Sequence, residues 1–83
     1  MKLNIYSVKD VVVGELGNPF YLSNDEEAKR AYKNAINANN GTNICINYQD
    51  TQLFKLGTFD TTTGNIDSKV EYLVNGIEMK QGE

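Results

Sequence analysis

The chain has 83 residues, a net charge of −3, 40% hydrophobic and 23% charged residues, which is the composition of one small folded domain. It contains no histidine and one cysteine, which excludes histidine-based catalysis, Cys–His nucleophilic pairs, zinc sites and an internal disulfide. We therefore expect a protein that binds without catalysing a reaction and needs no cofactor. The acidic balance disfavours general coating of nucleic acid, which needs a basic surface.

The first segment is expected to form strands. Alternating apolar side chains over residues 2–8 predict a strand, and Val11–Val13 predicts its continuation after a bend or a second short strand. The glycines and proline of Gly14–Pro19 then break it. No apolar run here is long enough for a signal peptide or a membrane span, which predicts a cytoplasmic protein without membrane contact.

The clearest local signal begins a helix. Ser23 with Glu26 three residues later fits a capping box, so the helix should start near Asn24. Apolar residues then recur at helical spacing and form one stripe, namely Ala28, Ala31, Tyr32, Ala35 and Ile36. Asn39–Gly41 favours a left-handed stop, so the helix should end near Ala38 after about four turns.

The next segment is less clearly patterned. Thr42–Tyr48 places Ile44, Ile46 and Tyr48 on one side of a predicted short strand. Cys45 lies between the two isoleucines and is expected to be a buried thiol that behaves as a small apolar side chain.

The C-terminal half predicts a hairpin. Gln52–Phe59 and Lys69–Val74 are strand candidates, and Asp60–Asn65 between them suits a turn. A calcium loop is the alternative for this turn, but the successive acidic ligands are missing. The predicted fold class is α+β, a single two-layer domain over residues 1–83, with one amphipathic helix on a small, mainly antiparallel sheet of three to four strands.

Three basic residues are the candidate nucleic-acid-binding site. Lys29, Arg30 and Lys33 form the densest positive cluster, on the outer face of the predicted helix. A solvated helix face is the simpler explanation, because Glu26 and Glu27 lie one turn away. Direct DNA binding predicts one continuous positive surface with exposed aromatic residues beside it.

Aromatic side chains could stack bases, as in proteins that bind single strands, or could form the core. The candidates are Tyr6, Phe20, Tyr21, Tyr48, Phe54 and Phe59. A second candidate site is the loop Asn18, Pro19 and Phe20, which could bind a protein partner. A rigid turn with Phe20 packed on the core explains that loop equally well.

Four short motifs follow one another along the chain, and their order is informative. They are Tyr6-Ser-Val-Lys-Asp10, Asn18-Pro-Phe20, Leu53-Phe-Lys-Leu-Gly57 and Phe59-Asp followed by Thr63-Gly64. Together they resemble the small nonstructural protein of gokushovirus-type microviruses (Microviridae), phages with small circular single-stranded DNA genomes. The resemblance spans residues 3–78. The chain departs from it at Tyr48–Thr51, where a Pro-Glu-Asp-Phe-like stretch would be expected.

The resemblance implies a protein that is made in the cytoplasm of the infected bacterium and is absent from the mature virion. Its implied role is in viral DNA replication, at the switch from duplex replication to single-strand genome synthesis. The implied partners are single-stranded DNA or phage and host replication proteins. The alternative is a homo-oligomeric protein-interaction module that binds a host or viral protein without DNA contact. An exposed apolar patch with a negative rim would favour that alternative.

Overall fold

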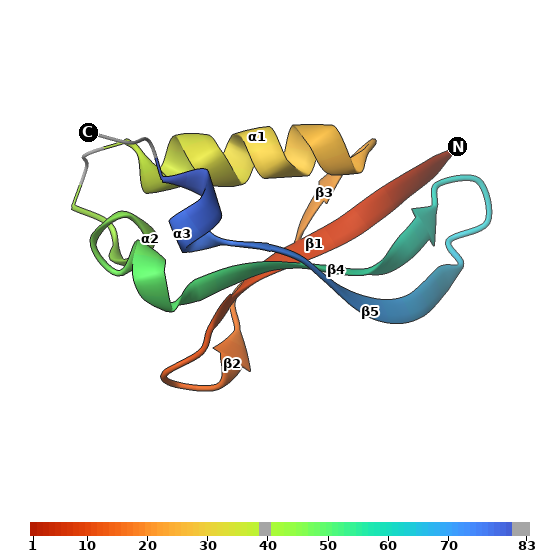
Figure 1. Cartoon of the computed structure of the whole chain (residues 1–83). Helices are drawn as coiled ribbons and strands as arrows, with labels where there is room; N and C mark the ends of the chain where they lie inside the picture. The colour runs from red at the N-terminus through yellow and green to blue at the C-terminus, as the bar shows by residue number, and fades with distance from the viewer. Residues whose placement is uncertain (39–40, 81–83) are drawn as a thin grey trace.

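The computed structural model describes residues 1–38 and 41–80. The elements in chain order are β1 (Lys2–Asp10), β2 (Glu15–Leu16), β3 (Phe20–Leu22), α1 (Asp25–Ile36), α2 (Asn43–Ile46), the 3₁₀ helix η1 (Tyr48–Asp50), β4 (Thr51–Asp60), β5 (Ile66–Asn75) and α3 (Gly76–Met79). The strands form one antiparallel five-stranded sheet in the order β2-β1-β4-β5, with β3 also paired to β1. Helix α1 lies across one side of this sheet (Figure 1).

The predicted α+β, two-layer fold is confirmed, with one correction to the strand number. The sheet has five strands where three to four were predicted. The additional strands, β2 and β3, are only two and three residues long and pair with different parts of β1. Such short edge strands carry too little side-chain pattern to be recognised from sequence.

The predicted hairpin between β4 and β5 is also confirmed. The Asp60 carboxylate accepts the backbone N–H of Thr62 at 2.9 Å, and Gly64 takes a left-handed φ of 81°. That hydrogen bond lowers the pKa of Asp60 below its ordinary value. Asp60 therefore stabilises a hairpin turn, as predicted for this segment in preference to a calcium loop.

Val11–Val13 is not a strand, contrary to one prediction. The three valines form the turn between β1 and β2, where the Asp10 carboxylate accepts the N–H groups of Val12 and Val13. Gly14 completes the turn with a φ of 84° and donates its N–H to the Asp10 carbonyl. Asp and Gly turn chemistry overrides the β propensity of valine here.

Helix α1 forms where expected but is shorter and capped one residue later. Asn24, and not Ser23, is the N-cap, and its side chain accepts the N–H of Glu27 at 2.8 Å. The Ser23 hydroxyl instead donates to the Glu27 carboxylate at 2.7 Å. The helix ends at Ile36 after 12 residues, about three turns. The predicted stop at Asn39 and Asn40 lies outside the described residues.

Residues 43–46 and 48–50 are helical, so the predicted strand over Thr42–Tyr48 is wrong. The backbone N–H of Ile46 donates to the Thr42 carbonyl at 2.9 Å, as in a helical turn. Ile44 and Tyr48 are spaced for a helix as well as for a strand, and both pack against the core, whereas Ile46 is exposed. The predicted burial of Cys45 is only partial.

The core lies between α1 and the sheet. Its buried members are Tyr6, Ala28, Tyr32, Ile36, Leu53 and Val74. The Tyr32 hydroxyl shares a 2.6 Å hydrogen bond with Thr51, and the Tyr6 hydroxyl donates to the Asp25 carboxylate at 2.6 Å. Burial, reinforced by the bond to Asp25, raises the pKa of Tyr6 to about 12. These two tyrosines join helix and sheet through polar as well as apolar contacts.

Candidate functional site

The face of the sheet turned away from α1, here called the open face, is the candidate site. Tyr6 and Val8 of β1 pack into the core, so the alternating residues Ile5, Ser7 and Lys9 point to the other side. Figure 1 shows α1 above the sheet, and in the part of the chain that the structure describes no helix lies beneath it.

A β-bulge decides which residues of β4 reach the open face. Ser7 faces Phe54 across the strands, and Leu3 faces Phe59, although strict alternation along β4 would place Phe54 and Phe59 on opposite faces. The register shift between Ile5 and Tyr6 inserts one extra residue in β4 and reverses the alternation. Both phenylalanines therefore lie on the open face.

Two pairs of aromatic rings result. Tyr21 lies 6.2 Å from Phe59, and Phe54 meets Tyr72 edge to face at 5.9 Å between ring centroids. Both tyrosines are 49% exposed. The Lys9 ammonium lies 5.7 Å from the centre of the Phe54 ring and adds a positive charge beside this pair.

Strand residues of the open face include no carboxylate in the described part of the chain. They are Leu3, Ile5, Ser7, Lys9, Leu16, Tyr21, Gln52, Phe54, Gly57, Phe59, Ile66, Ser68, Val70, Tyr72 and Asn75. The acidic residues of β5, Asp67 and Glu71, lie on the opposite side, where they line a shallow hollow with Lys55. Glu78 of α3 reaches the rim, 3.4 Å from the Tyr72 hydroxyl.

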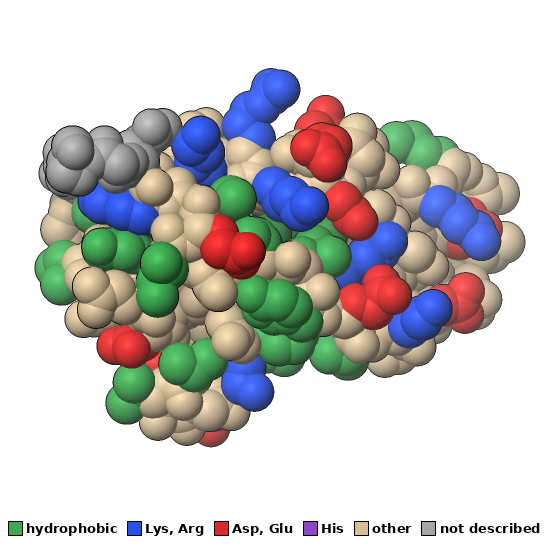
Figure 2. All heavy atoms as spheres, viewed as in Figure 1, with side chains coloured by type: hydrophobic (Ala, Val, Ile, Leu, Met, Phe, Trp, Pro, Cys, Tyr) green, Lys and Arg blue, Asp and Glu red, His purple; other side chains and the backbone are tan. Residues whose placement is uncertain are grey.

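The predicted basic cluster is brought together but lies apart from these rings. Lys29, Arg30 and Lys33 line one hollow on the outer surface of α1, together with Glu26 and Met79. Basic and acidic side chains are interspersed on the molecular face that Figure 2 shows. The exposed aromatic residues, Tyr21 and Tyr72, are on the open face, so the described residues do not combine the cluster with exposed rings in a single surface.

The six predicted stacking residues divide between core and surface. Tyr6 is buried, and Phe20 and Tyr48 pack against the core. The remaining three, Tyr21, Phe54 and Phe59, belong to the open face. Three of the six residues thus belong to the core, and three lie on a surface where they could stack bases.

The loop Asn18–Phe20 shows the same division. Phe20 stacks on Tyr6 with 5.8 Å between ring centroids, in agreement with a turn anchored on the core. Asn18 and Pro19 are exposed. Partner binding by these residues stays a prediction.

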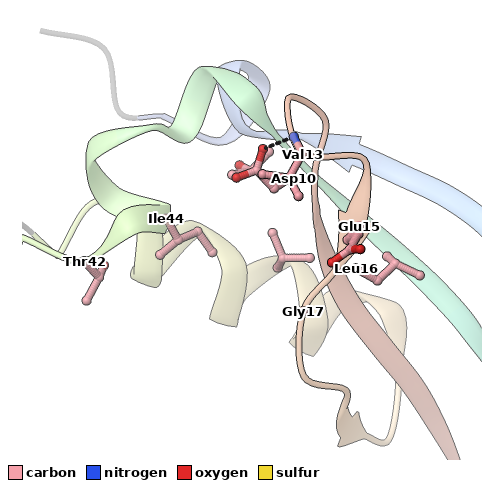
Figure 3. A pocket seen from close by; sticks show the side chains of 9 residues that line it. Asp10, Val13, Glu15, Leu16, Gly17, Thr42 and Ile44 are labelled. Atoms are coloured by element: carbon pink, nitrogen blue, oxygen red, sulfur yellow. Dashed lines mark hydrogen bonds between the residues drawn. The ribbon is translucent and has the colours of Figure 1, made fainter.

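A groove lies between the β1–β2 hairpin and α2 (Figure 3). Its volume is about 520 Å³, and Val8, Val13 and Ile44 contribute apolar side chains to its lining. Asp10 and Glu15, which face each other across the two strands, place carboxylates at its rim. This is an apolar patch with a negative edge, next to the exposed valines of the hairpin turn.

Comparison with known families shows which family the chain belongs to. The family model described as Phage ORF5 protein matches residues 3–79. The chain belongs to the Phage ORF5 family. No curated protein and no solved structure matches it.

Two other kinds of feature were sought among the described residues of this member of the Phage ORF5 family, a metal site and a membrane-spanning helix. Residues 1–38 and 41–80 contain no group of three or more Cys, Asp or Glu side chains placed to hold a metal ion. They also contain no helix long and apolar enough to cross a membrane.

Among the residues that form the two ring pairs and their cation, sequence reasoning missed Lys9 and Tyr72. A signal for Tyr72 is present in β5, where Ile66, Val70 and Tyr72 alternate with the charged residues of the strand. Lys9 has no such signal, because its contact with Phe54 depends on the pairing of β1 with β4.

Proposed function

We propose that this phage accessory protein binds single-stranded DNA on the open face of its sheet and does so without catalysis. It acts in viral DNA replication of a gokushovirus-type microvirus, at the switch to single-strand genome synthesis. Its place of action is the cytoplasm of the infected bacterium, and it does not enter the mature virion.

The observation that carries this proposal is the pairing of a half-exposed tyrosine ring with a partly buried phenylalanine ring in each of two places, beside a cation. The described strand residues of that face include no carboxylate. Unpaired bases stack on aromatic side chains, and each stacked base contributes about 1–3 kcal/mol to binding. Tyr21 with Phe59 and Phe54 with Tyr72 offer two platforms for such bases. Lys9 supplies a positive charge for the phosphates beside the second platform.

The same arrangement favours single strands over duplex DNA. Bases in a duplex are already stacked and paired, so their faces are not available to the rings, whereas a single strand can turn its bases onto them. A protein with a net charge of −3 offers little of the phosphate neutralisation on which duplex binding depends. Every base has an aromatic face, so binding should tolerate sequence changes.

The test compares two surfaces of the same molecule. Fluorescence anisotropy of labelled oligothymidylate and of duplex DNA is measured for the wild type, for Phe54→Leu/Tyr72→Leu and for Lys29→Ala/Arg30→Ala/Lys33→Ala. The open-face variant should weaken single-strand binding by roughly tenfold or more, and the helix variant should change it little. Loss of binding only in the helix variant would transfer the site to α1. Absence of binding at low salt in the wild type would reject direct DNA contact.

A second candidate function rests on the groove. Its apolar lining and its carboxylates Asp10 and Glu15 fit an apolar side chain of a protein partner that carries a neighbouring basic residue. Val13→Ser/Glu15→Gln separates the two functions, because neither residue belongs to the open face. If the groove serves a protein partner, this variant blocks phage growth and leaves DNA affinity unchanged.

A further inference from the structure

Strand β5 forms one long edge of the sheet. It is the last strand in the order β2-β1-β4-β5, and its residues 66–72 are all exposed. No strand among residues 1–38 and 41–80 pairs with its outer side (Figure 1). The backbone N–H and C=O groups on the outer side of residues 66–72 are therefore a template for pairing with another chain.

The charges of β5 define which chain fits. Lys69 and Glu71 lie on the same side of the strand, with 3.8 Å between Nζ and Oε2, and Val70 between them points to the open face. We propose that two copies of the protein pair antiparallel through β5 about a two-fold axis at Val70. Lys69 of each copy then faces Glu71 of the second copy, which gives two opposite-charge pairs in one interface.

Neighbouring registers lack this complementarity. Centred on Lys69, the pairing would set Lys69 against Lys69 and Asp67 against Glu71. Centred on Glu71, it would set the two Glu71 side chains against each other. Like charges directly opposite one another are destabilising.

A register centred on Ser68 would also match charges, since it sets Asp67 against Lys69. It would, however, confine pairing to residues 66–70, because the partners of Glu71 and Tyr72 would lie in the hairpin turn. The Val70 register takes in both Glu71 and Tyr72 and is therefore the one proposed.

The dimer has a consequence for the open face. A two-fold axis perpendicular to the sheet keeps both α1 helices on one side and joins the two open faces on the other. The Phe54–Tyr72 pairs of the two copies would lie on either side of the axis. Dimer formation itself does not depend on DNA binding, so either proposal can fail alone.

The test is sedimentation equilibrium of the full chain with charge variants. The wild type should dimerise in a concentration-dependent manner at micromolar concentration. Lys69→Glu alone sets two carboxylates against each other in each facing pair, and Glu71→Lys alone sets two ammonium groups against each other. Each single variant should therefore weaken the dimer by about tenfold or more. Mixing the two variants should restore dimers, because every facing pair then has opposite charges.

Three further results complete the design. Lys29→Glu, the same charge change on α1, is the matched control and should leave dimerisation unchanged. The double variant Lys69→Glu/Glu71→Lys should dimerise like the wild type, since the exchange preserves both pairs. A wild type that stays monomeric overturns the proposal, as does a dimer that neither single variant weakens. If the mixture fails to associate, the Val70 register is overturned. That result would point to pairing about Ser68, in which the carboxylate introduced by Lys69→Glu faces Asp67 of the other variant and repels it.

Discussion

Lys9 of β1 holds its ammonium group 5.7 Å from the centre of the Phe54 ring of β4, on the side of the sheet opposite α1. This contact brings a cation to an aromatic surface within a protein of net negative charge. It also sets the salt dependence expected of the site, because each phosphate neutralised on a single strand contributes a slope of about −0.7 to the plot of log affinity against log salt.

Lys9→Gln should therefore lower the salt slope of oligothymidylate binding by about 0.7, while the aromatic contribution persists at high salt. The measurement is the affinity across a salt series. A slope near −2, lost on replacing Lys29, Arg30 and Lys33 by alanine, would instead indicate about three phosphate contacts on α1.

Tyr6→Phe should destabilise the fold. The Tyr6 hydroxyl donates to the Asp25 carboxylate at 2.6 Å and accepts from the Asn4 amide at 2.9 Å, and phenylalanine loses both bonds. A hydrogen bond to a charged group contributes about 1.5–3 kcal/mol, so the free energy of unfolding in urea should fall by about that amount. Tyr21→Phe, whose ring is on the open face, is the control and should leave stability nearly unchanged.

Alkaline pH should unfold the protein through the same residue. The pKa of Tyr6 rises from 10.0 to about 12 on folding. Between these two pH values the Tyr6 hydroxyl is protonated in the folded state and ionised in the unfolded state. The contribution of Tyr6 to stability should be constant below pH 10 and should be lost between pH 10 and about 12. Burial also raises the pKa of Tyr32, so Tyr6→Phe should reduce this loss without abolishing it. A Tyr6→Phe profile identical to that of the wild type would contradict the assignment.

The cap of α1 gives a direct comparison of neighbouring residues. Asn24→Ala removes the acceptor for the Glu27 N–H and should cost about 1 kcal/mol in thermal or urea unfolding. Ser23→Ala loses only an exposed hydroxyl contact with the Glu27 carboxylate and should cost less. The opposite order of effects would restore Ser23 as the cap.

Gly57 is a position of β4 that cannot accept a side chain without a shift of the backbone. A Cβ there would overlap the backbone carbonyl of Asp67, and its φ of 153° is also unfavourable for other residues. Gly57→Ala should therefore destabilise the sheet by about 3 kcal/mol or more. Gly64→Ala, in an open turn at φ 81°, should cost only about 1–2 kcal/mol. Equal losses in unfolding experiments would mean that β4 and β5 are less closely paired at Gly57.

Helix α1 and the β4–β5 hairpin could be predicted from sequence because their signals are local. Helical spacing from Ala28 to Ile36 and the Asp60–Asn65 turn each lie within a few neighbouring residues. Residues 43–50 could not be assigned in this way, because Ile44 and Tyr48 fit both a strand and a helix. Contacts with the core, which are not local, select the helix.

The open face was beyond sequence reasoning for a different reason. It depends on the register of β1 with β3 and β4 and of β4 with β5, which brings together residues distant in the chain such as Tyr21 and Phe59. The bulge in β4 then moves Phe59 to the face of Phe54, against the alternation from which a strand is recognised. The basic cluster of α1 was visible because helical neighbours are close in sequence.

The most direct test of DNA binding on the open face is a backbone-amide NMR titration with a short oligothymidylate. The largest shifts should occur at Lys9, Tyr21, Phe54, Phe59 and Tyr72, with α1 little affected. Shifts confined to α1 around Lys29–Lys33, or no shifts at low salt, would contradict it.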